Sequence, residues 1–72
     1  MKTFNDNGKI YNVDTGEEVS RFDITSIIGN FTYHSDGTNS NQIGNMSYHS
    51  DGTFTMEIGN SFITDGKTVF KR

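Results

Sequence analysis

Residues 28–42 read IGNFTYHSDGTNSNQ and residues 43–57 read IGNMSYHSDGTFTME, so the middle of the chain is one fifteen-residue unit written twice. A third copy opens at Ile58-Gly59-Asn60 and then shortens into SFITDGKT. Self-similarity at a fixed period means that one supersecondary unit is reused and packs against its own neighbours. The 72 residues therefore form a single domain, 1–72, with repeats at 28–42, 43–57 and 58–72 after a diverged N-terminal unit at 1–27.

Turn signals stand at both ends of each unit. Asp-Gly predicts a hairpin, because Gly takes positive φ without steric cost and Asp tolerates turn conformations. The structural turn residues are Asp36, Gly37, Asp51, Gly52, Asp65 and Gly66. Gly-Asn at 29–30, 44–45 and 59–60 predicts the reverse turn at the opposite end. Short segments rich in Thr, Tyr, Phe, Ile and Ser separate the turns, which is typical of β-strands. The sequence predicts an all-β antiparallel meander of short hairpins.

The odd period of the repeat predicts the kind of turn. Two-residue loops at both ends would present opposite faces in successive copies. With a three-residue loop at Ser35-Asp36-Gly37 and Ser50-Asp51-Gly52, closed by Gly as a G1 bulge, successive copies present the same face. The predicted pairs are His49 with Thr53, Tyr48 with Phe54 and Met46 with Met56.

This register divides the side chains between two faces, and we expect the apolar face to form the core. The apolar face carries Ile28, Phe31, Tyr33, Ile43, Met46, Tyr48, Phe54, Met56, Ile58 and Ile63. The polar face carries Thr32, His34, Thr38, Ser40, Gln42, Ser47, His49, Thr53, Thr55 and Glu57. Asn39 and Asn41 fall on the apolar side, either at an opening or edge, or in a hydrogen-bonded ladder inside, since an unpaired buried amide costs about 1–3 kcal/mol.

Both ends of the chain deviate from the repeat. The third copy is one residue shorter between Gly59 and Gly66, which leaves the faces of Phe62, Val69 and Phe70 open. In the N-terminal unit, turn chemistry predicts two loops. Residues 5–8 would bring Phe4 beside Ile10, and residues 14–16 would bring Tyr11 toward Val19. Residues 17–28 form either one bent strand broken near Thr25-Ser26 or a strand followed by a helical turn, and their β-branched content favours the strand.

The means of covering the apolar face stays open at this level. A flat single layer would leave a large apolar patch in water, which normally marks an interface. The sheet therefore curls into a barrel or sandwich, or is closed by face-to-face oligomerisation. We favour a homo-oligomer, because a short chain with no cysteine buries a thin core. A closed monomeric barrel is the main alternative, and a β-solenoid with one coil per repeat is a third.

Charge and hydropathy limit the partners. Six basic residues stand against nine acidic ones, for a net charge of −3, and only Lys71-Arg72 forms an adjacent basic pair. We expect no nucleic-acid partner, since no basic stripe could follow a phosphate backbone. The first residues lack the apolar region of a signal peptide, and no run approaches the roughly 20 apolar residues that span a bilayer. We therefore expect no membrane partner and a cytoplasmic location by default.

The repeated YHSDG segment is the one candidate for chemistry. His34 and His49, with Asp36, Asp51 or Glu57, offer metal-ligand atoms, but the histidines lie two strands apart, about 10 Å between backbones. Zinc needs nitrogen atoms about 2.0–2.1 Å from one ion. We therefore predict no metal and no cofactor.

Asp36, Asp51 and Asp65 each precede a turn glycine, which accounts for them structurally. Residues 6–8 lack the further ligands of an EF-hand loop. No phosphate loop, nucleophile elbow or zinc-protease motif occurs, so we predict that the protein is not an enzyme.

Tyr33 and Tyr48, next to asparagine and aspartate, have the aromatic and polar character of carbohydrate sites. Core packing is the simpler account, because both tyrosines fall on the apolar face. With the adjacent His34 and His49 they are the candidate ligand-binding residues, and repetition would give such sites avidity.

The segments Gly29-Asn30…Tyr33-His34-Ser35-Asp36-Gly37 and Gly44-Asn45…Tyr48-His49-Ser50-Asp51-Gly52 resemble the short Tyr/Asp-Gly hairpin repeats of bacterial proteins, including YD-type repeats. The resemblance covers about residues 28–66, and it implies no activity. The sequence thus predicts a small non-enzymatic β-repeat protein that acts by self-association or protein binding. The alternative is a carbohydrate- or surface-binding module with repeated shallow sites.

Overall fold

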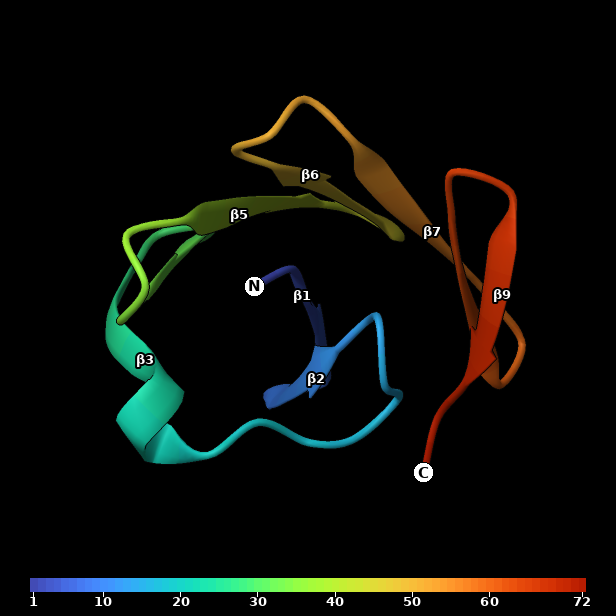
Figure 1. The fold of residues 1–72 in the computed structure, drawn as a ribbon, viewed down its shortest axis with the longest axis horizontal. Helices are drawn as coiled ribbons and strands as arrows, with labels where there is room; N and C mark the ends of the chain where they lie inside the picture. The colour runs from blue at the N-terminus through green and yellow to red at the C-terminus, as the bar shows by residue number, and fades with distance from the viewer.

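The computed structural model describes all 72 residues and contains nine strands and one short helix (Figure 1). The elements are β1 (Thr3–Asp6), β2 (Lys9–Asn12), the 3-10 helix η1 (Arg21–Asp23), β3 (Ile24–Ile28), β4 (Phe31–His34), β5 (Asn39–Ile43), β6 (Met46–His49), β7 (Phe54–Ile58), β8 (Ser61–Thr64) and β9 (Lys67–Phe70). Strands β3 to β9 form one seven-stranded antiparallel sheet in sequence order, and β1 and β2 form a separate hairpin. The predicted all-β antiparallel meander is confirmed.

The repeated hairpins have the predicted three-residue loops. Tyr48 pairs with Phe54 and Met46 with Met56. The His49 N–H donates to the Thr53 carbonyl at 2.9 Å. The loop is closed by a glycine with φ of 91° in each copy, Gly37 and Gly52, as a G1 bulge requires. The odd period therefore identified the bulge correctly.

The third unit is shorter because its loop has two residues. Asp65 and Gly66 have φ of 50° and 78°, the pattern of a type I′ turn, and they join Thr64 to Lys67. The shorter loop still pairs the inward-facing residues of β8 with inward-facing residues of β9, because only the loop and not the strand has lost a residue. Phe62 pairs with Val69 on the inner side, where it is fully buried, and Phe70 lies outside with 68% of its surface exposed.

The sheet curls, but it curls in the direction opposite to our expectation. The predicted polar face is concave and buried, with Ser47 at 1% and Thr55 at 0% exposure. The predicted apolar face is convex and faces solvent, so its assignment to the core is wrong. The sheet does not close into a barrel: β3 and β9 remain separate edges, and the β1–β2 hairpin lies inside the arc (Figure 1).

Hydrogen bonding to the hairpin accounts for this inversion. The open edge of β1 faces the concave side chains of β5 and β6, which replace a neighbouring strand. Thr3 N–H donates to Ser40 Oγ at 3.2 Å, and the Thr3 carbonyl accepts from Ser47 Oγ at 2.7 Å. Asn5 N–H donates to Gln42 Oε1 at 3.1 Å. Buried backbone groups need partners, and the serine hydroxyls and the Gln42 amide supply them where apolar side chains could not.

The apolar core is small and lies between the hairpin and β8. It consists of Phe4, Val13 and Phe62, with Tyr11 packed against them. The ring centroids of Phe4 and Phe62 are 5.1 Å apart, and those of Tyr11 and Phe62 are 5.7 Å apart. Such tilted aromatic pairs add to the stability gained from burial alone.

Two N-terminal pairings differ from the predictions by one residue. Phe4 pairs with Tyr11 rather than Ile10, because the loop is the two-residue type I′ turn Asn7-Gly8, with φ of 53° and 87°. Likewise Tyr11 bridges to Glu18 rather than to Val19.

Residues 17–28 combine features of both alternatives. A helical turn, η1, precedes the strand instead of following it, and the Ser20 side chain caps it by accepting from Phe22 N–H at 3.2 Å. Strand β3 then has a register shift between Ile24 and Ser26, close to the predicted break.

The two residues that follow β9 bind to the N-terminal unit. The Lys71 ammonium lies 2.7 Å from Asp6 Oδ2 and also pairs with Glu57. Arg72 N–H donates to the Gly16 carbonyl at 2.8 Å. No helix of the structure has the length and apolar character needed to cross a membrane.

Candidate binding surfaces

The convex face carries a set of large apolar side chains in contact with water. We define the convex patch by its members with 36–68% exposure: Ile28, Phe31, Ile43, Tyr48, Phe54, Met56, Ile58 and Phe70. Isolated exposed apolar residues are ordinary on protein surfaces. Eight of them stand on the same side of one sheet, and exposed apolar surface gathered in this way usually marks an interaction surface.

Strand pairing arranges the patch in rows that cross the sheet. In one row Phe31 pairs with Asn41, Asn41 with Tyr48 and Tyr48 with Phe54. A second row joins Ile43, Met46, Met56 and Ile63. No row contains a charged residue, because the repeat places charges in loops or on the concave face.

Tyr33 and Tyr48 both lie on the convex face, so the expectation that they pack in the core is wrong. Tyr48 is 42% exposed and its ring lies 5.8 Å from that of Phe54, whereas Tyr33 is half-buried and stacks on Phe31 at 6.0 Å. Asn39 and Asn41 lie between them on β5, an interior strand of the sheet, and are half-buried. The asparagines are therefore on the outer surface, neither at a sheet edge nor inside.

His34 is on the concave face, 3% exposed, and both ring nitrogens have hydroxyl partners. Nε2 lies 2.8 Å from Thr3 Oγ1, and Nδ1 lies 2.8 Å from Thr38 Oγ1. Burial lowers the pKa of His34 below its ordinary value, with a smaller contribution from the N-terminal ammonium. The imidazole is therefore neutral at pH 7 and links the hairpin to the sheet.

His49 is buried in the same way one repeat later, at 6% exposure. Its Nδ1 lies 2.7 Å from Ser40 Oγ, and its Nε2 lies 2.7 Å from Thr55 Oγ1, which in turn lies 2.6 Å from Thr64 Oγ1. Burial, helped by the charge of Lys2, lowers the pKa of His49 to about 4. Both histidines are structural, and neither faces solvent.

The turn aspartates Asp36 and Asp51 each accept a hydrogen bond from within their own turn. Asp36 Oδ1 accepts from the Thr38 N–H at 3.0 Å, and Asp51 Oδ1 accepts from the Thr53 N–H at 3.0 Å. Hydrogen bonds from the N-terminal ammonium and from Thr38 hold the pKa of Asp36 well below its usual range. Those from Thr53 and Lys2 do the same for the pKa of Asp51.

The candidate metal ligands do not converge. Each histidine nitrogen already has a hydroxyl partner, and Glu57 pairs with Lys71. No group of three or more His, Asp or Glu side chains is placed to hold a metal ion.

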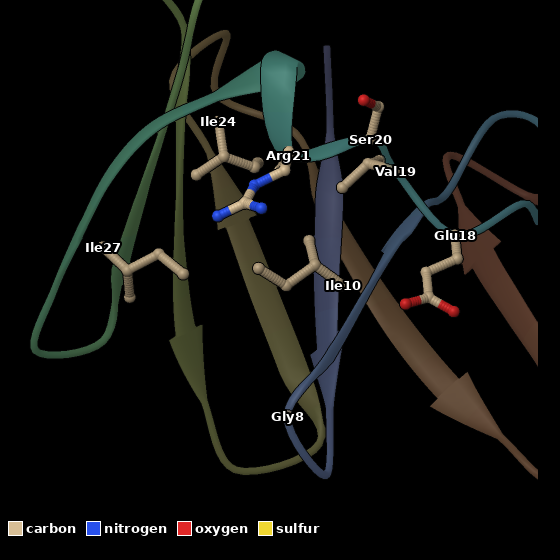
Figure 2. A pocket seen from close by; sticks show the side chains of 8 residues that line it. All are labelled: Gly8, Ile10, Glu18, Val19, Ser20, Arg21, Ile24 and Ile27. Atoms are coloured by element: carbon tan, nitrogen blue, oxygen red, sulfur yellow. The ribbon is translucent and has the colours of Figure 1, made fainter.

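A second surface is a groove at the open end of the concave face, between the hairpin and β3 (Figure 2). It has a volume of about 560 Å³ and is lined by Gly8, Ile10, Glu18, Val19, Ser20, Arg21, Ile24 and Ile27. Sequence reasoning missed it, because its residues come from the N-terminal unit and not from the repeats. The only sequence signal was the cluster of isoleucines in residues 17–28.

Comparisons of the chain with protein-family models, with curated proteins and with solved structures return no match.

Proposed function

We propose that this is a non-enzymatic β-repeat protein that acts by self-association, and that the convex patch is its contact surface. One observation carries the proposal: eight large apolar side chains stand exposed on one uncharged side of the sheet. A monomer keeps this surface in water at a cost of about 25 cal/mol for each Å² of apolar area that a partner could cover.

The aromatic members supply much of the apolar area. Phe31, Tyr48, Phe54 and Phe70, at roughly 150–250 Å² each and about half exposed, present on the order of 300–500 Å², and the aliphatic members add to it. An interface of standard size takes about 800 Å² from each partner.

The absence of charge favours a second copy as the occupant. The chain has a net charge of −3, yet the rows of the convex patch contain no ionised side chain. Two copies can therefore meet through this face without bringing like charges together. A charged partner would gain nothing there, since electrostatic complementarity needs an opposing charge.

A second candidate is carbohydrate binding, and the row Phe31, Asn41, Tyr48 favours it. The pairing places an amide between two aromatic rings on an exposed surface. Sugar sites combine ring faces with polar groups that fix hydroxyls. Titrating a panel of neutral glycans while recording tyrosine fluorescence tests this candidate, and Asn41→Ala, which keeps both rings, should abolish any response.

Light scattering after size-exclusion chromatography tests self-association. Phe54→Lys and Met56→Lys place a charge in the patch and should convert the oligomer to a monomer. The matched control is Asn60→Lys, which adds the same charge in an exposed turn and should leave the oligomer unchanged. A wild-type protein that stays monomeric at millimolar concentration contradicts the proposal.

A further inference from the structure

The concave face is covered at its centre and open at one end. The hairpin packs on β5 and β6, and the groove lies beyond it, next to β3. Ile24 and Ile27 pair with His34 and Thr32, so they belong to the buried side of the sheet, yet Ile27 is 53% exposed. Four aliphatic side chains, Ile10, Val19, Ile24 and Ile27, line the groove. Its lining is that of a site for an aliphatic group.

The groove runs beside an unpaired strand edge. Strand β3 has β4 on one side and no strand on the other. Ile28 and Phe31 flank a two-residue turn and so form a hydrogen-bonded pair. Alternation then directs the N–H and C=O of Ile27 away from β4, toward the open edge. Such an edge is a template for a further strand.

Arg21 supplies a charge at the same place. Its guanidinium lies among Ile10, Ile24 and Ile27 in Figure 2, whereas the Glu18 carboxylate lies on the other side of Ile10. None of the four ion pairs of the structure involves Arg21. A guanidinium binds a carboxylate through two parallel hydrogen bonds.

We propose that this groove binds the carboxyl-terminal end of an extended aliphatic peptide. The peptide adds to β3 as a strand and exchanges backbone hydrogen bonds with Ile27. The peptide residue opposite Ile27 has its side chain on the same face of the sheet, which directs it into the groove. The terminal carboxylate pairs with Arg21, and Glu18 disfavours acidic residues earlier in the peptide. This site is independent of the convex patch, so either proposal can fail without the other.

Fluorescence anisotropy with a labelled peptide tests the site. The probe is fluorescein-Lys-Thr-Val-Thr-Val with a free carboxylate, and we expect saturable binding. Its C-terminal amide should bind at least fivefold more weakly, and Arg21→Gln should weaken the free acid by the same factor without changing the amide. Arg72→Gln removes an equal charge from an exposed residue outside the groove and should have no effect. Equal binding of acid and amide, or no saturation at 1 mM protein, overturns the proposal.

Two further measurements locate the contact. Amide chemical shifts should move at Gly8, Ile24 and Ile27 when peptide is added, and shifts confined to Tyr48 and Phe54 would place the contact on the convex patch and overturn the proposal. N-methylation of the peptide amide that pairs with Ile27 should abolish binding. If the methylated peptide binds normally and decanoate displaces it, the groove is a small-carboxylate site and not a strand edge, which also overturns the proposal.

Discussion

His49 Nδ1 lies 2.7 Å from Ser40 Oγ on the neighbouring strand, and both side chains are buried beneath the N-terminal hairpin. This contact is central to the fold, because Ser40 Oγ also accepts the N–H of Thr3. A histidine of the repeat is thereby joined to the first strand through one hydroxyl. The contact that holds the N-terminal hairpin on the sheet therefore requires a neutral His49 imidazole.

The free energy of unfolding should decrease as the pH is lowered from about 6.5 to about 4. In the unfolded chain His49 titrates near pH 6.5, whereas in the folded protein its pKa is lowered to about 4. The unfolded state therefore binds a proton first, so the stabilisation is complete above pH 6.5 and is lost as pH falls. At pH 5 the loss from His49 is about 2 kcal/mol. Urea denaturation at pH 7 and pH 5 measures it, and His49→Asn should reduce the dependence to the part that comes from His34, whose pKa is also lowered by burial. A stability that is constant over this range would contradict the burial of the imidazole.

Replacing the hydroxyl of Thr55 should destabilise the protein. Thr55→Val keeps the shape of the side chain but leaves His49 Nε2 and Thr64 Oγ1 without a shared partner. Losing a buried partner costs about 1–3 kcal/mol. Thr68→Val is the control, since Thr68 is exposed and should change the urea midpoint little. Equal effects of the two substitutions would mean that the hydroxyl network contributes nothing.

Phe62 should be the most sensitive apolar residue of the sheet. It is fully buried against Phe4 and Tyr11, and truncating a buried Phe to Ala costs about 3–5 kcal/mol, enough to unfold a small domain. Phe62→Leu fills part of the space and keeps the measurement accessible by thermal denaturation. Phe70→Ala removes an equally large side chain from the convex patch and should leave the monomer nearly as stable. A larger loss for Phe70→Ala would mean that the convex face is the core.

Gly16 and Gly52 should differ sharply in their tolerance of alanine. Both have positive φ, 79° and 91°, so alanine strains the backbone at each by about 1–2 kcal/mol. A Cβ at Gly52 would meet nothing within 4 Å, whereas one at Gly16 would lie 2.0 Å from the Phe70 carbonyl oxygen. Gly16→Ala should therefore cost more and release the end of β9. Amide exchange at Phe70 and Lys71 reports that release, and equal costs for the two variants would show that the close approach is absent.

Several elements could be predicted from the residues because they depend on local rules. The G1 bulges at Gly37 and Gly52 followed from the odd repeat and the period-two alternation of strands. The one-residue errors at Phe4 and Tyr11 arose in the diverged unit, where no second copy fixes the register. The groove at Arg21 could not be predicted, because it forms only where the hairpin leaves part of the concave face uncovered.

By itself the sequence determined the all-β meander, the strand pairs of the repeats and the division of side chains between two faces, since these depend on turn chemistry and alternation along the chain. Only the tertiary structure decided which face is inside. That choice depends on where the hairpin lies, because Thr3 and Asn5 need hydrogen-bond partners for backbone groups that no strand can satisfy. The hydroxyl, amide and imidazole groups of the polar face meet that need, so they are buried and the apolar residues face outward.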